Sequence, residues 1–356
     1  MSARVVELTV QDLSEVVTFV CAQAGAQRGV RFDPVEAMPR YRWLLEENPR
    51  RRGEFIGWGL RDAGGALAGT NLCCWQHYER GGEIRAALHS GDYYVAESAR
   101  GPLSLALLLN MLRHPEADLS ICATANVNGA AVWEAIKGIP VEGSGWEVLI
   151  PLNLTALAAG ALAKKLPEGM LRRSAAGLGA WLPRTGPRFV RPADLQIEEV
   201  KPEDVFRIVV HPVTQLWEPR RDGAWLSWRY ASAYSARSCR LLRISRSRTA
   251  GDIFVGTHIG SRGVGGRVRA LTVLDVWGDA DGANASDLLG ALASHFRSSI
   301  DVICLRLLAA RLWKDQWPGR SRLRELEART HWMISRKQKL DPAEWAFTMA
   351  DGDGRI

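Results

Sequence analysis

Apolar and polar positions follow patterns that predict both strands and helices along the chain. VVELTVQDLSEVVTF (5–19) has the pattern of a strand followed by a helix, and the leucine-rich runs at 103–113 and 286–296 are typical of packed helices. Two glycine pairs, in GGEIRA (81–86) and GGRVRA (265–270), precede alternating positions, as in β-hairpins. This mixture predicts an α/β (α+β) fold.

The two hairpins belong to a longer repetition, because the elements around them recur in the same order. The first strand and helix are matched by IEEVKPEDVFRIV (197–209), whose helix opens with Pro202, Glu203 and Asp204, as helix N-termini do. Further matched pairs are 40–49 with 225–234, 66–70 with 253–257, 87–95 with 271–277, 103–113 with 286–296, and 118–126 with 299–307. A helix bearing Trp133 likewise parallels one bearing Trp313. The repetition predicts a tandem duplication.

The predicted organisation is an N-terminal domain over 1–152, a basic connecting segment over 153–192 and a C-terminal domain over 193–356. Each domain is predicted to hold a mixed sheet with helices on both faces. In the connecting segment, Leu157 to Lys165 suggest an amphipathic helix, and 171–182 suggest another. These helices either pack against the two domains or meet an anionic surface, so peripheral membrane contact stays open.

Composition narrows the class of protein. The 356 residues are 47% hydrophobic and 24% charged, as in soluble globular proteins. The first residues lack the apolar stretch of a secretory signal, and the longest apolar stretch, Val148–Ala163, is short for a bilayer and interrupted by polar residues. We therefore expect a cytoplasmic protein without a transmembrane segment. The oligomeric state is not predicted.

The charge and the cysteines limit the partners. A net charge of +7 favours anionic partners, but the arginines are scattered without a nucleic-acid-binding signature, so nucleic acid is not expected. The six cysteines show neither CxxC spacing nor a cluster with histidine. We expect reduced thiols and no metal site.

Two segments of the first half resemble a known family. GDYYVAESARGPLSLALLLNMLR (91–113) and ICATANVNGAAVWEAIKGIPV (121–141) resemble the strand–loop–helix and strand–helix units of GNAT acyltransferases (Gcn5-related N-acetyltransferases). The order of elements over nearly the whole chain, with WRY at 228–230 and EWAFTMADGDG at 344–354, resembles tandem GNAT proteins linked to bacterial surface-polysaccharide synthesis. The resemblance implies two tandem GNAT-like mixed sheets flanked by helices.

The resemblance also implies a coenzyme A site, because the family's Arg/Gln-x-x-Gly-x-Gly/Ala loop lets a helix N-terminus approach the pyrophosphate. Residues 98–103 keep the central Gly101 and add the cation of Arg100, but Ser98, Pro102 and Leu103 depart from the pattern. An ordinary helix start is the alternative interpretation. The implied ligand is acetyl-CoA or another acyl-CoA, and the implied binding residues are Val95, Arg100, Gly101, Leu103, Ser104 and Asn126.

The second copy is predicted not to bind this cofactor. Its matching loop carries Asp279, Asp281 and Asp287, whose charges would repel a pyrophosphate. GSRGVGG (260–266) reads as hairpin glycines and lacks the ending of a P-loop. We expect this copy to shape a substrate cleft.

Family members place a base on or near the strand that precedes the loop, which here carries His89 and Asp92. Residues three apart on a strand face opposite sides unless a bulge intervenes, and Gly91 favours one. A buried structural histidine and a salt-bridged aspartate are the alternatives, and for the matching Asp275 a salt bridge is the favoured one. The family's helix tyrosine, an acid for the thiolate, is replaced by Trp133, so Glu134 is the candidate acid.

The aromatic residues of the matched segments 40–49 and 225–234 permit two interpretations. Trp43, Trp225, Trp228 and Tyr230 either stack on sugar rings or pack in a core, and the core is favoured. The sequence thus predicts an acyl-CoA-dependent N-acyltransferase acting on a small-molecule amine, with an amino sugar as one candidate. The alternatives are a Fem-type aminoacyl transferase, which takes its donor from aminoacyl-tRNA, and an inactive tandem scaffold.

Overall fold

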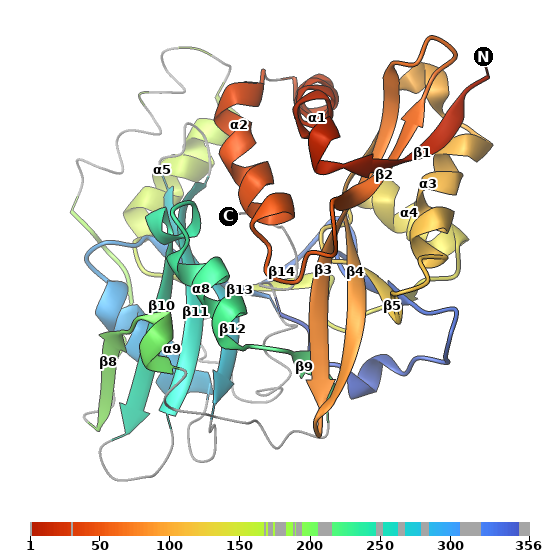
Figure 1. Ribbon diagram of the computed structural model, residues 1–356. Helices are drawn as coiled ribbons and strands as arrows, with labels where there is room; N and C mark the ends of the chain where they lie inside the picture. The colour runs from red at the N-terminus through yellow and green to blue at the C-terminus, as the bar shows by residue number, and fades with distance from the viewer. Residues whose placement is uncertain are drawn as a thin grey trace.

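The computed structural model describes residues 2–29, 31–166, 169, 174, 183–187, 189, 194–205, 216–246, 252–262, 268–278, 285–306 and 322–348. Its strands form two mixed sheets flanked by helices, which lie next to each other in Figure 1. This arrangement confirms the predicted fold class.

The first sheet holds most strands of the N-terminal half. Its order along the sheet is β1 (Arg4–Thr9), β2 (Phe55–Arg61), β3 (Leu67–Arg80), β4 (Glu83–Val95), β5 (Leu119–Cys122), β15 (Trp332–Ile334) and β6 (Ile139–Pro140), and β9 (Glu218–Pro219) pairs with β3. Only the β4–β5 pair is parallel among these described strands. The hairpin of GGEIRA joins β3 to β4.

The second sheet has the same plan. Its order is β8 (Leu195–Glu199), β10 (Cys239–Arg246), β11 (Asp252–Arg262), β12 (Val268–Gly278), β13 (Val302–Arg306), β7 (Trp146–Pro151) and β14 (Arg322–Glu325). Here β12 and β13 form the parallel pair, at the position that β4 and β5 hold in the first sheet.

The two sheets exchange strands between the halves of the chain. β7 of the N-terminal half pairs with β13 in the second sheet, and β15 of the C-terminal half pairs with β5 in the first. Sheet membership therefore crosses the domain boundaries expected at 152 and 193, which stay predictions. The apolar pattern of β7 specifies a buried strand but not the sheet that receives it.

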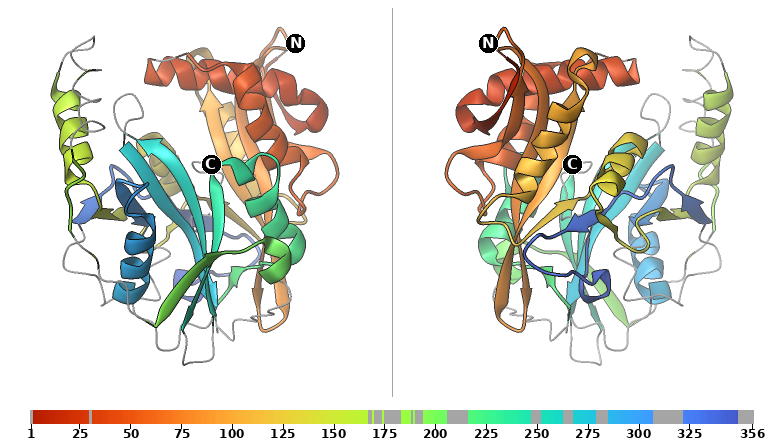
Figure 2. Two further views of the ribbon diagram at one scale, coloured as in Figure 1. Left: turned by 90° about the vertical axis from the view of Figure 1, so that its left-hand side faces the viewer. Right: turned by 90° about the vertical axis from the view of Figure 1, so that its right-hand side faces the viewer.

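Helices cover the outer faces and the junction between the sheets. They are α1 (Leu13–Arg28), α2 (Pro34–Tyr41), α3 (Pro102–Leu112), α4 (Val127–Ala135), α5 (Leu154–Lys165), α7 (Pro202–Val205), α8 (Gly223–Ala231) and α9 (Ala285–Phe296), with short turns η1 (Val10–Asp12), η2 (Arg42–Glu46), η3 (Glu97–Ala99), η4 (Ser235–Arg237) and η7 (Pro342–Glu344). Figure 2 shows α3 and α4 against the first sheet and α9 against the second, where they share apolar cores with the strands. The amphipathic helix expected near Leu157 corresponds to α5. The helix expected at 171–182 lies outside the described residues except for position 174, and Asp279, Asp281 and Trp313 lie outside them entirely.

One apolar core joins the two halves. It contains residues of α1, η2 and β3 together with residues of α8 and β10–β12. At its centre, the Trp43 and Trp228 indoles stack with ring centroids 4.8 Å apart. Each indole N–H donates to the other residue's carbonyl oxygen, at 3.0 Å from Trp43 and 2.8 Å from Trp228. Trp225 and Tyr230 are buried as well, so these four side chains are core residues and not sugar-stacking platforms.

An equivalent hydrogen bond from a backbone amide to an aspartate occurs in each half. The Asp118 carboxylate accepts from the Ala86 amide at 2.9 Å, and the Asp301 carboxylate accepts from the Arg269 amide at 2.9 Å. Each aspartate precedes the parallel strand of its sheet and ties it to the strand that leaves the hairpin. Corresponding sequence positions therefore hold corresponding places in the two sheets.

Candidate functional site

A bulge interrupts β4 at the residue that sequence analysis singled out. The pairing of β3 with β4 shifts between Thr70, opposite Tyr94, and Leu72, opposite Gly91. Asp92 lies in the bulge with φ 43°, a left-handed conformation that short polar side chains tolerate better than most. The bulge expected next to Gly91 is therefore present.

The bulge coincides with the end of the parallel pairing in the first sheet. β4 and β5 pair from Ala87 with Leu119 to Ser90 with Cys122, and beyond this point β4 pairs only with β3. The backbone groups of β4 that follow Ser90 on the β5 side have lost their strand partner. A bound molecule can therefore reach the backbone of β4 here.

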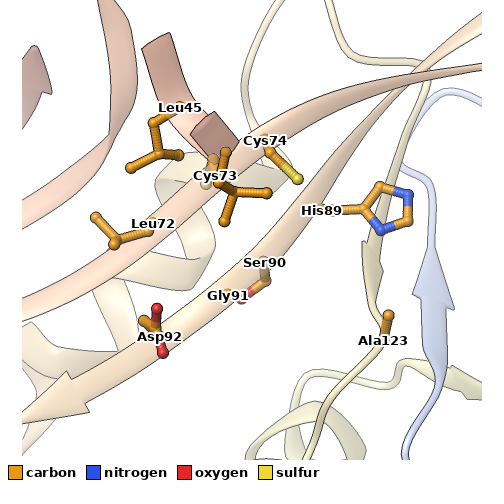
Figure 3. Close-up of a pocket in the computed structure, with 10 residues that line it drawn as sticks. Leu45, Leu72, Cys73, Cys74, His89, Ser90, Gly91, Asp92 and Ala123 are labelled. Carbon is orange, nitrogen blue, oxygen red and sulfur yellow. The ribbon is translucent and has the colours of Figure 1, made fainter. Parts of the chain in front are cut away.

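A small pocket lies at this place (Figure 3). Four elements line it: η2 with Leu44 and Leu45, β3 with Leu72, Cys73 and Cys74, β4 with His89, Ser90, Gly91 and Asp92, and the chain after β5 with Ala123. Its walls are largely apolar, and the Asp92 carboxylate lies at one side.

Two side chains hold the Asp92 carboxylate. The Tyr41 hydroxyl donates to Oδ2 at 2.8 Å, and Arg40 Nη1 lies 3.5 Å from the same oxygen. The Asp92 side chain is 18% exposed. Both contacts use Oδ2, so Oδ1 has no partner among the described residues. The sequence did not point to Arg40 or Tyr41 as site residues, although their segment, 40–49, is aromatic.

His89 lies in a different environment. Its side chain is 2% exposed, and Nε2 lies 3.3 Å from the Tyr78 hydroxyl. Burial, with a contribution from the nearby charge of Arg229, lowers the pKa of His89 to about 3. Figure 3 shows the imidazole directed away from Asp92. The environment of His89 fits a buried structural histidine better than a catalytic base that acts beside Asp92.

The α3 N-terminus is exposed close to the end of β4. Gly101 precedes the helix with φ 154°, a conformation that L side chains rarely adopt. The Ser104 amide and hydroxyl donate to the Gly101 carbonyl oxygen at 3.0 and 2.6 Å, and Pro102 has no N–H. The Leu103 amide therefore remains as the backbone donor of the first turn. Leu103 is 45% exposed.

The other expected binding residues lie at the ends of β4, α3 and α4. Val95 ends β4 opposite Gly69, and Arg100 is exposed just before the helix. Asn126 caps α4, because its side-chain oxygen accepts from the Gly129 amide at 2.8 Å. The structure thus brings the ends of β4, α3 and α4 together on the first sheet, while Ser104 and Asn126 each serve a helix terminus.

On α4, the two candidate positions for a thiolate acid differ in exposure. Trp133 is 2% exposed and packs against Gly138 in the core beneath the helix. Glu134 is exposed to solvent. Trp133 therefore has a packing role, and only Glu134 can exchange protons with solvent directly.

In the second sheet, the residue that corresponds to Asp92 is held by another side chain of the protein. The β11–β12 pairing shifts between Gly256 and Thr257, which places a bulge beside Asp275. Two nitrogens of Arg221 donate to the Asp275 carboxylate at 2.7 and 2.9 Å, and Asp275 is fully buried. This confirms the predicted salt bridge and leaves Asp275 without a role toward a ligand.

The described part of the chain offers neither a group of metal ligands nor a helix suited to span a membrane. No three metal-ligating side chains of histidine, cysteine, aspartate or glutamate gather in it. None of its helices combines the length and the apolar character that a bilayer crossing requires.

Comparisons with known proteins show similarity in structure only. No protein-family model and no curated protein sequence matches the chain. An Enterococcus faecalis V583 protein described as a probable N-acyltransferase superposes with a TM-score of 0.57 at 12% identity, covering 94% of this chain and 72% of its own. A GCN5-related N-acetyltransferase from Anabaena variabilis ATCC 29413 gives 0.55 at 12% identity, with 93% and 72% covered.

N-myristoyltransferase from Saccharomyces cerevisiae, solved with bound myristoyl-CoA, gives a TM-score of 0.53 at 11% identity. The alignment covers 97% of this chain and 84% of the enzyme. The chain therefore has the fold of GNAT-like N-acyltransferases.

Proposed function

We propose that the protein is an acyl-CoA-dependent N-acyltransferase that acts on an amine. The observation that carries the proposal is the pocket at the β4 bulge, which Asp92 lines and where the parallel strands β4 and β5 stop pairing. The fold shared with N-acetyltransferases and N-myristoyltransferase supports the same reaction class.

The first half fits coenzyme A in two places. The exposed α3 N-terminus supplies the Leu103 amide, the positive end of the helix dipole and the nearby Arg100 cation for a pyrophosphate. Gly101 leaves the approach open, since no protein atom lies within 4 Å of where a side chain would begin. The unpaired edge of β4 after Ser90 can bind an amide-containing arm through its backbone groups.

Asp92 is the proposed base. Its Oδ1 takes one proton from the acceptor's ammonium group, which leaves a neutral amine, while Tyr41 and Arg40 hold Oδ2. The amine nitrogen then forms a bond with the thioester carbonyl carbon, loses its second proton to solvent, and the carbon–sulfur bond breaks. The β4 amides beyond the bulge are the proposed donors to the carbonyl oxygen. Solvent or the exposed Glu134 then protonates the departing thiolate.

We further infer that the two halves arose by duplication and that the second half shapes the acceptor site. The matching strand orders and the reciprocal Trp43–Trp228 contact support the duplication. Tyr234 of the second half lies against Trp43, with ring centroids 5.3 Å apart, beside the helix that carries Arg40. Amino sugars, such as those of bacterial surface polysaccharides, are the narrower form of the proposal for the acceptor.

Calorimetry with acetyl-CoA tests the proposed function. We expect binding to the wild type and none to Gly101→Glu, because the new carboxylate would repel the pyrophosphate and the side chain would strain the backbone. Gly81→Glu in the β3–β4 turn is the matched control, since Gly81 also has a positive φ, 57°, but lies away from α3. Absence of wild-type binding at millimolar ligand would leave the Fem-type transferase and the scaffold.

A further inference from the structure

We propose that the pocket at the β4 bulge admits only a short acyl group, acetyl or propionyl, and that Leu44, Leu45 and Leu72 set this limit. The inference rests on the proposed function, because it places the thioester at the bulge. It adds the substrate class that the fold leaves open: neighbours of the same fold include both N-acetyltransferases and an enzyme that binds myristoyl-CoA.

The volume of the pocket sets the first limit. Its free volume is about 10 Å³, close to the smallest space that holds one water molecule. A methyl or ethyl group can occupy such a space after a small adjustment of the walls. A long acyl chain cannot enter it without displacing whole side chains.

The walls of the pocket belong to the packed interior. Leu44, Leu45 and Leu72 are 4%, 3% and 2% exposed and lie in the core that joins the two halves. The same core contains Val16 and Val17 of α1. Because interiors are packed as closely as organic crystals, we infer that core neighbours fill the space behind these leucines and leave no room there for further methylene groups.

The segment that carries two of the leucines is fixed in place. Leu44 and Leu45 follow Trp43 in η2. The Trp43 indole donates a hydrogen bond to the Trp228 carbonyl oxygen and stacks on the Trp228 ring. An outward shift of η2 would break both reciprocal hydrogen bonds of this pair. The other lining residues belong to β3 and β4, which pair with each other in the sheet, and to the chain just after β5, at Ala123. The pocket is therefore closed at its inner end by rigid elements.

Calorimetry with free CoA, acetyl-CoA, butyryl-CoA and octanoyl-CoA tests the limit on the wild type. We expect acetyl-CoA to bind about tenfold or more tightly than octanoyl-CoA, since a chain that finds no pocket stays in water or strains the protein. Equal or tighter binding of octanoyl-CoA would overturn the proposal. If free CoA and all thioesters fail to bind, the proposed function itself is wrong; binding without discrimination refutes only the chain-length limit.

Two variants test the named walls. Leu45→Ala should enlarge the pocket and reduce the acetyl-to-octanoyl affinity ratio about tenfold, whereas Leu292→Ala, an equally drastic change in the second core, should leave the ratio as in the wild type. Ala123→Val should fill the pocket and remove the preference for acetyl-CoA over free CoA. Because Ala123→Val adds volume at a small residue, it remains informative if Leu45→Ala does not fold. An unchanged ratio in folded Leu45→Ala, or an unchanged preference in Ala123→Val, contradicts the assignment of the walls.

Discussion

At the scale of single residues, the proposed chemistry centres on Asp92, and the sequence predicted only part of its environment. Its place on β4 and the bulge beside Gly91 follow from local pattern, and both are present. Its partners Arg40 and Tyr41 do not follow, because the Tyr41–Asp92 contact joins positions 51 residues apart and depends on how α2 packs. Local pattern also left His89 open between base and core, and its burial supports the core.

Asp92→Asn should lower the turnover of acetyl-CoA with a primary amine about 100-fold, because the amide cannot take the ammonium proton. Cofactor affinity should be unchanged, since Asp92 lies at the acyl end of the site. The measurement is thiol release with a panel of amines that includes D-glucosamine, together with calorimetry of acetyl-CoA. Turnover equal to that of the wild type would remove Asp92 from the mechanism.

Tyr41→Phe removes the hydroxyl that holds Oδ2 and should lower kcat about tenfold without changing the affinity for acetyl-CoA. A positioning residue acts through its partner, so adding Tyr41→Phe to Asp92→Asn should cause little further loss. Tyr230→Phe is the control, because the buried Tyr230 hydroxyl has no hydrogen-bond partner among the described residues. Multiplicative losses in the double variant would show that Tyr41 does not act through Asp92.

At the scale of elements, the sequence predicted which strands and helices form but not which sheet every strand joins. The order of strands and helices and the GGEIRA hairpin are properties of neighbouring residues, and they appear in the described part of the structure as expected. The exchange of β7 and β15 is not such a property. A buried strand has the same apolar pattern in either sheet, so its partner is decided by chain connectivity and by competition between the two free edges.

The exchange predicts that the halves depend on each other for folding. A fragment of residues 1–152 would expose Val148 and Ile150, which are 2% and 0% exposed in the second core, and would leave β5 without β15. We expect this fragment to lack a cooperative thermal transition by circular dichroism and to regain one when co-expressed with residues 153–356. Cooperative unfolding of the fragment alone would show that the exchanged strands are dispensable.

At the scale of the whole molecule, the junction between the halves is stabilised by buried groups that must stay neutral. His89 is 2% and His331 is 1% exposed. Burial, with added repulsion from Arg229 and Arg306 respectively, lowers the pKa of each imidazole to about 3. In the unfolded chain both would titrate near the ordinary pKa of about 6.5. Both therefore take up protons only when the junction opens.

This difference predicts a loss of stability in mild acid. Because the folded pKa values are depressed, the histidines contribute their stability above pH of about 6.5, and it is lost progressively as the pH falls from there toward about 3. Each should remove about 1 kcal/mol from the free energy of unfolding between pH 7 and pH 5.5. Urea denaturation at these two values measures the change, and His89→Gln should reduce it. A pH dependence that is the same in wild type and variant would contradict the assignment.

The proposed function requires that the first half alone holds acyl-CoA between the β4 bulge and the α3 N-terminus. A crystal structure of the protein grown with acetyl-CoA tests it most directly. We predict the thioester in the pocket beside Asp92, with the pyrophosphate at Leu103 and Gly101. Acetyl-CoA bound against the second sheet, or held away from α3, would contradict the claim.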